Sequence, residues 1–173
     1  MKKSYKEKLP YITTFIFDID GVFTTGEVIL FQNEFVRTLH SKDAYAIQYA
    51  KKMGYRLFAI TGGESEQTKR TLEAIGLTHV YLNSANKIEV YNSCKEEYNF
   101  KDDEVLYMGD DLPDYPLLQK VHVSSCPQDA APEIKKICDY QSPIFGGKGC
   151  VRDVIEQTLK SQDKWFTEHS FVW

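Results

Sequence analysis

The chain has 173 residues, a length typical of one domain, and it can bury a hydrophobic core without disulfide bonds or a structural metal. Hydrophobic residues make up 42% of it and charged residues 27%, which excludes a disordered chain and a collagen-like repeat. The net charge of −4 argues against nucleic acid as the main partner.

Short apolar runs alternate with helical patterns along the chain. In chain order the patterns predict a strand over Ile12–Phe17, a helix over Asp43–Met53, a strand over Arg56–Ile60, a helix over Glu64–Ile75, a strand over His79–Leu82, a helix over Lys87–Tyr98, strands over Glu104–Met108 and Val121–Ser125, and a helix over Val151–Leu159. Apolar strands separated by helices are typical of a parallel sheet covered on both faces. We therefore predict a three-layer, Rossmann-like α/β fold.

One segment, at about residues 21–42, breaks this alternation. Val28–Phe31 and Phe35–Leu39 have the pattern of two strands joined around Gln32-Asn33-Glu34, so we predict a β-hairpin that projects from the sheet. The first of these strands is apolar on both faces, and such a surface promotes aggregation unless something covers it. We therefore expect copies of the chain to pack around the hairpin.

Acidic residues follow two of the predicted strands. Asp18 and Asp20 come directly after the first strand, and as alternate residues they can point the same way. Asp110, Asp111 and Asp114 follow the fourth strand of the main series. Clustered carboxylates repel one another unless a cation compensates, and their oxygens suit a hard divalent ion such as Mg²⁺. Taken alone, each cluster is more often a turn or a solvated helix N-terminus.

Two further strand ends carry groups that suit a phosphate. Thr61, Gly62 and Gly63 offer a hydroxyl and unobstructed backbone N–H groups, which together can bind an anion. Lys87 opens a helix, where the helix dipole does not favour a cation. Ligands of parallel α/β sheets bind beyond the carboxyl ends of the strands. Together the four strand ends predict phosphoryl transfer by a carboxylate nucleophile.

The motif order resembles that of the haloacid dehalogenase-type phosphatases, through Phe17-Asp18-Ile19-Asp20-Gly21-Val22, Ile60-Thr61-Gly62, Asn86-Lys87 and Gly109-Asp110-Asp111-Leu112-Pro113-Asp114. The resemblance implies that Asp18 attacks phosphorus and becomes an aspartyl phosphate. It implies that Asp20 protonates the leaving alcohol and then activates water. Thr61 and Lys87 are implied to hold the phosphoryl oxygens.

The same resemblance implies a Mg²⁺ site and its surroundings. The ligands are expected to be Asp18, the backbone carbonyl of Asp20, and Asp110. Asp111 and Asp114 are expected to orient the metal site or Lys87. A second acid at Asp20 favours phosphate esters over dehalogenation, because an alkoxide leaving group needs a proton.

A finer resemblance, to the 3-deoxy-D-manno-octulosonate 8-phosphate phosphatases, covers nearly the whole chain. It rests on the hairpin segment and on Ser41–Ile47, Tyr107–Asp114 and Gly146–Asp153. It implies a Mg²⁺-dependent, cytoplasmic homotetramer that cleaves a sugar-acid phosphate in lipopolysaccharide biosynthesis. Lys42, Lys148 and Arg152 are the candidates to bind the sugar carboxylate, although each could be an ordinary surface cation.

The spacing of the motifs leaves no room for a separate cap domain. Asp18 and Thr61 are 43 positions apart, and Thr61 and Lys87 are 26 apart, so the predicted elements fill both gaps. We expect one phosphatase domain over residues 1–173, with an apolar C-terminal tail at about residues 161–173. Because an open site would admit water, we expect a homo-oligomer, most simply a tetramer, to cover it.

Departures from the family pattern leave the substrate open. The chain has Gly63 and Lys148 where the family often has Arg, and Ala44 where it usually has Gly. Lysine cannot bind a carboxylate bidentately as arginine does. The alternative is a phosphatase of a nine-carbon sialic-type acid 9-phosphate, of the KDN or N-acetylneuraminate type. Of two non-enzyme alternatives, a silent regulatory homologue is disfavoured by the presence of both Asp18 and Asp20. A receiver-like module is disfavoured because no lone Asp ends the third strand and because it leaves the hairpin unexplained.

The remaining signals concern the compartment. No run approaches the ~20 apolar residues of a membrane span, and no signal-peptide pattern is visible, so we expect a cytoplasmic protein without a membrane partner. The four cysteines show neither C-x-x-C pairing nor zinc-ligand spacing, which favours free thiols.

Overall fold

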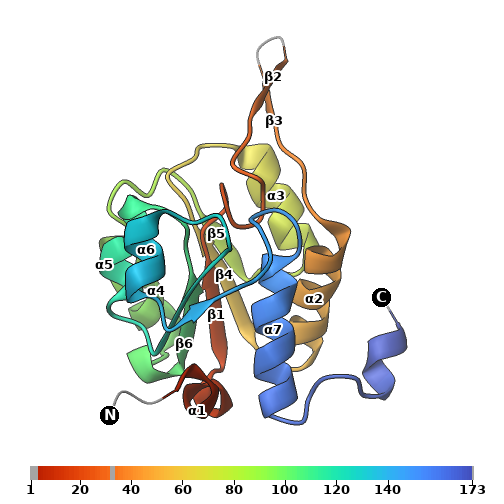
Figure 1. Ribbon diagram of the computed structural model, residues 1–173. Coiled ribbons are helices and arrows are strands. Elements are labelled where there is room, and N and C mark those ends of the chain that lie inside the picture. The colour runs from red at the N-terminus through yellow and green to blue at the C-terminus, as the bar shows by residue number, and fades with distance from the viewer. Residues whose placement is uncertain (1–3, 32–33, 173) are drawn as a thin grey trace.

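The computed structural model describes residues 4–31 and 34–172 (Figure 1). Within these residues the main sheet has six parallel strands. Their spatial order is β5 (His79–Tyr81), β4 (Arg56–Ile60), β1 (Thr14–Phe17), β6 (Val105–Met108), β7 (Val123–Cys126) and β8 (Tyr140–Gln141). The predicted three-layer α/β fold is confirmed.

Alternate residues of β1 pack into two cores on opposite faces of the sheet. One face is covered by α2 (Ser41–Lys52), α3 (Glu66–Ile75) and α7 (Cys150–Ser161), and the other by α4 (Lys87–Tyr98), α5 (Tyr115–Leu118) and α6 (Pro132–Ile137) (Figure 1). Phe15 and Phe17 belong to the first core and Ile16 to the second. Because burial of each such side chain contributes about 1.5–3 kcal/mol, a strand covered on both faces needs a continuous apolar sequence.

The main strands and helices begin and end within two residues of the predicted bounds. The predicted helix from Glu64 begins at Glu66, because Ser65 serves as the N-cap and accepts the N–H of Thr68 at 3.2 Å. Short elements were not predicted, among them α1 (Tyr5–Lys8), α5, α6 and β8. Among the described residues, all four cysteines are free and no helix has the length and apolar character needed to cross a membrane.

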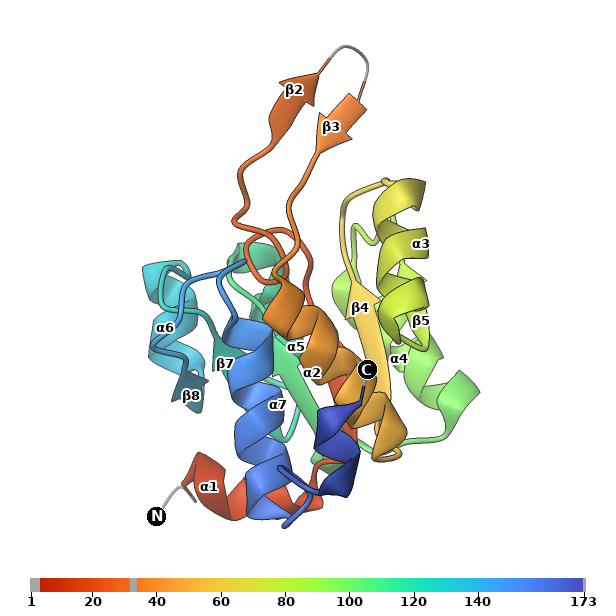
Figure 2. The same cartoon turned by 90° about the vertical axis from the view of Figure 1, so that its right-hand side faces the viewer.

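The predicted hairpin is present, but it forms a sheet of its own. β2 (Ile29–Phe31) pairs antiparallel with β3 (Glu34–Val36), and the pair projects beyond the carboxyl ends of the main strands (Figure 2). The predicted turn residues 32 and 33 lie outside the described residues. Leu30 is 76% exposed and Ile29 57% exposed, so a single chain leaves apolar hairpin surface in water.

The expected absence of a cap domain is also seen in the part of the chain that the structure describes. Between Asp18 and Thr61 the helices and strands are those of the hairpin, α2 and β4. Between Thr61 and Lys87 they are α3 and β5. The cavity at the sheet edge is therefore not roofed by a separate domain of its own chain.

The C-terminal segment packs against its own subunit. The ring of Trp165 contacts that of Tyr49 edge-on, with 5.2 Å between centroids, and the Tyr49 hydroxyl donates to the carbonyl of Lys164 at 3.0 Å. The last turn, η4 (Glu168–Phe171), leaves Phe166 and Phe171 largely exposed. The tail therefore lies along α2 and adds an apolar patch to that side of the molecule.

Candidate active site

Four loops at the carboxyl edge of the sheet line one cavity of about 450 Å³. In the central strand, Phe17 is in register with Ala59 of β4 and Met108 of β6, so the loops after these strands lie side by side. The predicted site residues that line the cavity are Asp18, Asp20, Thr61, Gly62, Lys87, Asp110 and Asp111. The structure thus brings together the motifs that the sequence spreads over more than ninety positions.

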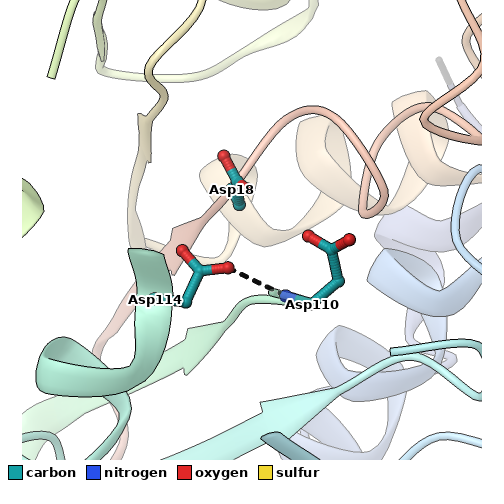
Figure 3. Close-up of side chains that lie close together, drawn as sticks. All are labelled: Asp18, Asp110 and Asp114. Carbon is teal, nitrogen blue, oxygen red and sulfur yellow. Dashed lines mark hydrogen bonds between the residues drawn. The ribbon is translucent and has the colours of Figure 1, made fainter. Parts of the chain in front are cut away.

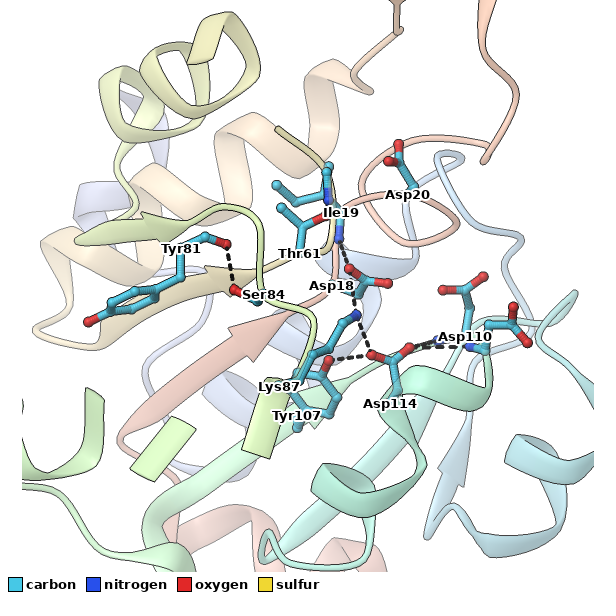
Figure 4. Close-up of polar contacts among 12 residues, drawn as sticks. Asp18, Ile19, Asp20, Thr61, Tyr81, Ser84, Lys87, Tyr107, Asp110 and Asp114 are labelled. Carbon is cyan, nitrogen blue, oxygen red and sulfur yellow. Dashed lines mark hydrogen bonds and ion pairs between the residues drawn. The ribbon is translucent and has the colours of Figure 1, made fainter. Parts of the chain in front are cut away.

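Asp18 stands at the centre of this cavity. Its backbone N–H continues the sheet by donating to Met108 at 2.9 Å, and its Oδ1 accepts the N–H of Ile19 at 2.7 Å. The ammonium of Lys87 lies 2.9 Å from the same Oδ1 (Figure 4). Burial, and then the charge of Asp114, raise the pKa of Asp18 to about 7, against the opposing effect of Lys87.

Lys87 is fixed by a second carboxylate, that of Asp114. Its Nζ lies 2.6 Å from Oδ1 of Asp114, which also accepts the hydroxyl of Tyr107 at 2.6 Å. The other oxygen of Asp114 accepts the backbone N–H groups of Asp110 and Asp111 at 2.9 and 3.2 Å. Burial alone would lower the pKa of Lys87, but the two carboxylates outweigh it and the pKa is raised. Lys87 is therefore held as a cation pointing into the site.

Three carboxylates converge beside Lys87. One oxygen from each of Asp18, Asp110 and Asp114 lies within 4.8 Å of the other two (Figure 3). Asp114 is already saturated with hydrogen bonds, which makes it a support of the cluster. Burial, and then the charges of Asp18 and Asp114, raise the pKa of Asp110 to about 8.

The unsatisfied atoms of this cluster test whether a metal fits it. Among the described residues, Oδ1 of Asp110 is buried and has no hydrogen-bond partner. A buried carboxylate oxygen without a donor, next to a second carboxylate, is strongly unfavourable unless a cation binds it. The residues Asp18 and Asp110 therefore fit a hard divalent cation, with Asp114 behind them.

Two glycines allow the carboxylates to come this close. Gly21 has a φ of +86°, and a Cβ there would lie 2.0 Å from Oδ2 of Asp110. A Cβ at Gly109 would lie 2.4 Å from Cγ of Asp114. A side chain at either position would have to displace an acidic side chain of the cluster, so both positions favour glycine.

The carboxylate of Asp20 lies apart from the Lys87 network (Figure 4). It forms a bidentate ion pair with Arg37. Nε of Arg37 lies 2.7 Å from Oδ1 of Asp20, and Nη2 lies 3.1 Å from Oδ2. Thr24 donates to Oδ1 at 3.1 Å. The side chain of Asp20 is thus not among the clustered carboxylates, and a metal bond from its backbone carbonyl stays a prediction.

The predicted phosphate-binding turn has an open geometry. Thr61 is buried, and its Oγ1 accepts the N–H of Gly63 at 3.0 Å, which tightens the turn after β4. A Cβ added to Gly62 would meet nothing within 4 Å, so the backbone there is freely accessible. Ser84, on the neighbouring loop after β5, also lines the cavity.

The three candidate cations for a sugar carboxylate do not line this cavity. Lys42 and Lys148 are exposed, and Arg152 lies between the rings of Tyr45 and Trp165, 5.7 and 5.2 Å from their centroids. The glycine loop before Arg152 instead packs against the backbone after Asp20. Their assignment to a substrate carboxylate within one protomer is therefore unsupported, and it stays a prediction for an assembled enzyme.

Sequence reasoning missed four residues that shape the site. Tyr107 donates a hydrogen bond to Asp114, and Thr24 donates one to Asp20. Both lie within seven positions of their partners, so closeness in the sequence could have indicated them. Ser84 precedes Lys87 by three positions. Arg37 carried no local signal, because its contact with Asp20 depends on the path of the hairpin.

The chain is similar in sequence to known proteins. Residues 78–145 match the model of the haloacid dehalogenase-like hydrolases. The chain is 32% identical over 158 residues to the 3-deoxy-D-manno-octulosonate 8-phosphate phosphatase KdsC of Escherichia coli (strain B / BL21-DE3), and the match covers 91% of this chain and 84% of that protein.

Solved structures share the whole architecture. The 3-deoxy-D-manno-octulosonate 8-phosphate phosphatase of Yersinia pestis superposes with a TM-score of 0.91 at 28% identity, covering 94% of this chain and 88% of that one. The cobalt-bound deoxy-D-mannose-octulosonate 8-phosphate phosphatase of Haemophilus influenzae superposes with a TM-score of 0.89 at 25% identity. The match covers 95% of this chain and 98% of that one.

Proposed function

The chain belongs to the 3-deoxy-D-manno-octulosonate 8-phosphate phosphatase family of the haloacid dehalogenase-like hydrolases, and from this premise we propose that it hydrolyses 3-deoxy-D-manno-octulosonate 8-phosphate to the free sugar acid and phosphate. One observation carries the chemistry: the buried carboxylate of Asp18 lies between the ammonium of Lys87 and the unsatisfied carboxylate of Asp110. A nucleophile, a cation and a metal ligand thus meet at one sheet edge.

The first step is the transfer of the phosphoryl group to Asp18. A carboxylate oxygen of Asp18 forms a bond to phosphorus as the bond to the sugar oxygen breaks. We expect Lys87, Thr61 and the backbone N–H of Gly62 to balance negative charge on the phosphoryl oxygens, because all three residues line the cavity. The leaving alkoxide takes a proton from Asp20.

The second step releases phosphate from Asp18. A water molecule attacks phosphorus, Asp20 takes the proton that the water loses, and the bond between phosphorus and Asp18 breaks. Asp20 suits both steps because it lines the same cavity yet is separate from the Lys87 network. The proton that Asp20 takes from water restores the acid form that serves the next leaving group, and one phosphate is released per turnover.

A bound Mg²⁺ would neutralise the transferring phosphoryl group and the acidic cluster at once. Asp18 and Asp110 would hold it, and Asp114 would keep Asp110 and Lys87 in place through its hydrogen bonds. The cobalt in the Haemophilus influenzae relative supports a divalent ion for this family.

We assign this reaction to lipopolysaccharide biosynthesis, because its product would be the sugar acid of that pathway. We expect the enzyme to work in the cytoplasm, and we expect its chain to form a single catalytic domain. Self-association, most simply into a homotetramer, would cover the exposed residues of the hairpin and close the unroofed cavity. Because the chain has Gly63 where the family often has Arg, and because Lys148 does not line the cavity, a nine-carbon sialic-type acid 9-phosphate is the competing substrate.

The test is a comparison of substrates with the purified enzyme and Mg²⁺. Phosphate release is measured with 3-deoxy-D-manno-octulosonate 8-phosphate and with 9-phosphates of KDN and N-acetylneuraminate. We expect kcat/KM to be highest for the eight-carbon acid. A higher value for either nine-carbon acid would replace this substrate while leaving the phosphatase chemistry in place.

A further inference from the structure

The ion pair between Arg37 and Asp20 engages the group that must serve the leaving oxygen. Arg37 reaches both carboxylate oxygens of Asp20, and Thr24 donates to one of them as well. While the guanidinium bonds to both oxygens, it holds the Asp20 carboxylate in one orientation and competes with a substrate oxygen for it. Asp20 therefore turns to the leaving group more readily if Arg37 finds another partner.

The cavity itself offers no spare cation to a substrate carboxylate. Of the described residues that line it, Lys87 alone is basic, and it is already shared by Asp18 and Asp114. Asp18, Asp20, Asp110 and Asp111 make the same cavity acidic. A sugar acid bound there needs a cation on its leaving-group side, because its own carboxylate would otherwise face like charges.

Arg37 is the cation on that side. Its guanidinium is bonded to Asp20 and lies about 4 Å from where a Cβ at Gly63 would stand, so the glycine leaves space in front of it. It also borders a groove of about 160 Å³ between the hairpin base and α3, lined in part by Ser65, Gln67 and Thr68. A further small hollow, lined in part by Asp20, Gly63 and Arg37, shares residues with both the active-site cavity and this groove.

Building on the proposed function, we propose that Arg37 is a specificity-determining residue that exchanges partners. When a sugar-acid phosphate binds, the guanidinium leaves Asp20 and pairs with the carboxylate of the substrate. Asp20 is then free to face the leaving oxygen. A phosphate ester without a carboxylate does not draw Arg37 away, so it is turned over poorly even though its phosphoryl group fits.

The chemistry of arginine suits this exchange. Its planar guanidinium binds one carboxylate bidentately and can bind another in the same way, so a closely similar interaction replaces the one that is lost. Two of its five N–H donors bond to described residues, both of them to Asp20. The Arg37 side chain is 13% exposed and that of Asp20 is 35% exposed, so the pair is half-buried and solvent screens it only in part.

The experiment crosses two substrates with variants of the full-length enzyme. The substrates are 3-deoxy-D-manno-octulosonate 8-phosphate and D-arabinose 5-phosphate, which has a primary phosphate and no carboxylate. Arg37→Ala should lower kcat/KM for the sugar acid about 10- to 100-fold, the range for losing a hydrogen-bonded charge. For the aldose phosphate it should raise kcat/KM, because Asp20 is no longer held by Arg37 and no carboxylate contact is lost.

Arg37→Lys should retain only part of the preference for the sugar-acid phosphate over the aldose phosphate, because lysine is charged but cannot bind a carboxylate bidentately. Arg70→Ala, which removes an exposed arginine on α3, is the matched control and should leave kcat/KM unchanged for both substrates. Competitive inhibition gives an independent readout. Arg37→Ala should weaken inhibition by the free sugar acid and leave inhibition by inorganic phosphate unchanged.

The outcomes separate the two proposals. If Arg37→Ala lowers kcat/KM equally for both substrates, or lowers neither, Arg37 does not select the carboxylate and this inference is wrong while the phosphatase stands. If the wild type releases phosphate from neither ester, the proposed function fails first. Thermal unfolding of each variant excludes loss of the fold as the cause.

Discussion

The ammonium of Lys87 lies 2.9 Å from Oδ1 of Asp18, so the proposed phosphate-binding cation touches the proposed nucleophile. The contact offsets the cost of burying the negative charge of Asp18, which is only 8% exposed. It also depends on Asp114, which holds Lys87 from the other side at 2.6 Å. The chain thus builds its nucleophile as one end of a buried network of charges.

Lys87→Ala should destabilise the protein and abolish most of its activity. The change leaves Asp18 and Asp114 buried without their cation, and breaking a buried pair costs about 3–5 kcal/mol. Tyr107→Phe is the matched milder variant, because it removes a single hydrogen bond to the Asp114 carboxylate, worth about 1.5–3 kcal/mol. Denaturant unfolding and phosphate release measure both effects, and equal losses in the two variants would contradict the network.

Gly21→Ala should disrupt the metal site. The added Cβ would lie 2.0 Å from Oδ2 of Asp110, so the carboxylate must move out of the cluster. Gly54→Ala is the control, since Gly54 has a similar φ of +87° but an added Cβ there meets nothing within 4 Å. Both variants carry the backbone penalty of about 1–2 kcal/mol, but only Gly21→Ala should lower the affinity for Mg²⁺. Calorimetric titration with Mg²⁺ distinguishes them, and equal affinities would show that Asp110 is not held where we place it.

Asp43 should make stability depend on pH. Burial raises the pKa of Asp43 from 3.8 to about 6, against the backbone N–H of Arg152, which donates to its Oδ1 at 2.7 Å. The folded state then binds more protons than the unfolded state between about pH 4 and pH 6. Stability should therefore fall as the pH rises through this window, by at most about 3 kcal/mol. Asp43→Asn keeps an acceptor for Arg152 and should reduce the slope in this window, while the raised pKa values of Asp18 and Asp110 account for the remainder. Denaturant titrations at several pH values would record the reduction, and an unchanged slope would exclude Asp43 as a source.

The exposed hairpin should be needed for assembly. Ile29 and Leu30 are more than half exposed in one chain, and we attribute their character to contacts between copies. Leu30→Lys should shift the protein toward smaller species in sedimentation velocity while the fold, followed by circular dichroism, remains. A wild type that sediments as a monomer with full activity would rule out this role.

Much of the fold followed from the sequence because its strands are buried on both faces, as Ile16 between Phe15 and Phe17 illustrates. The motif residues were also predictable, because residues after neighbouring parallel strands must lie side by side. Short elements such as β8 escaped prediction because two residues carry no periodicity. Arg37 escaped because a contact 17 positions from Asp20 is set by the hairpin's path rather than by any local pattern.

The most direct measurement of the central claim is phosphate release from 3-deoxy-D-manno-octulosonate 8-phosphate by the wild type and by Asp18→Asn, with Mg²⁺ and after its removal by a chelator. We predict turnover by the wild type only when Mg²⁺ is present, with activity restored by adding Mg²⁺ back. We predict a loss of at least about a thousandfold in Asp18→Asn, because the amide cannot replace the carboxylate nucleophile. Comparable release by the two proteins, or release by the wild type that ignores the chelator, would contradict the account.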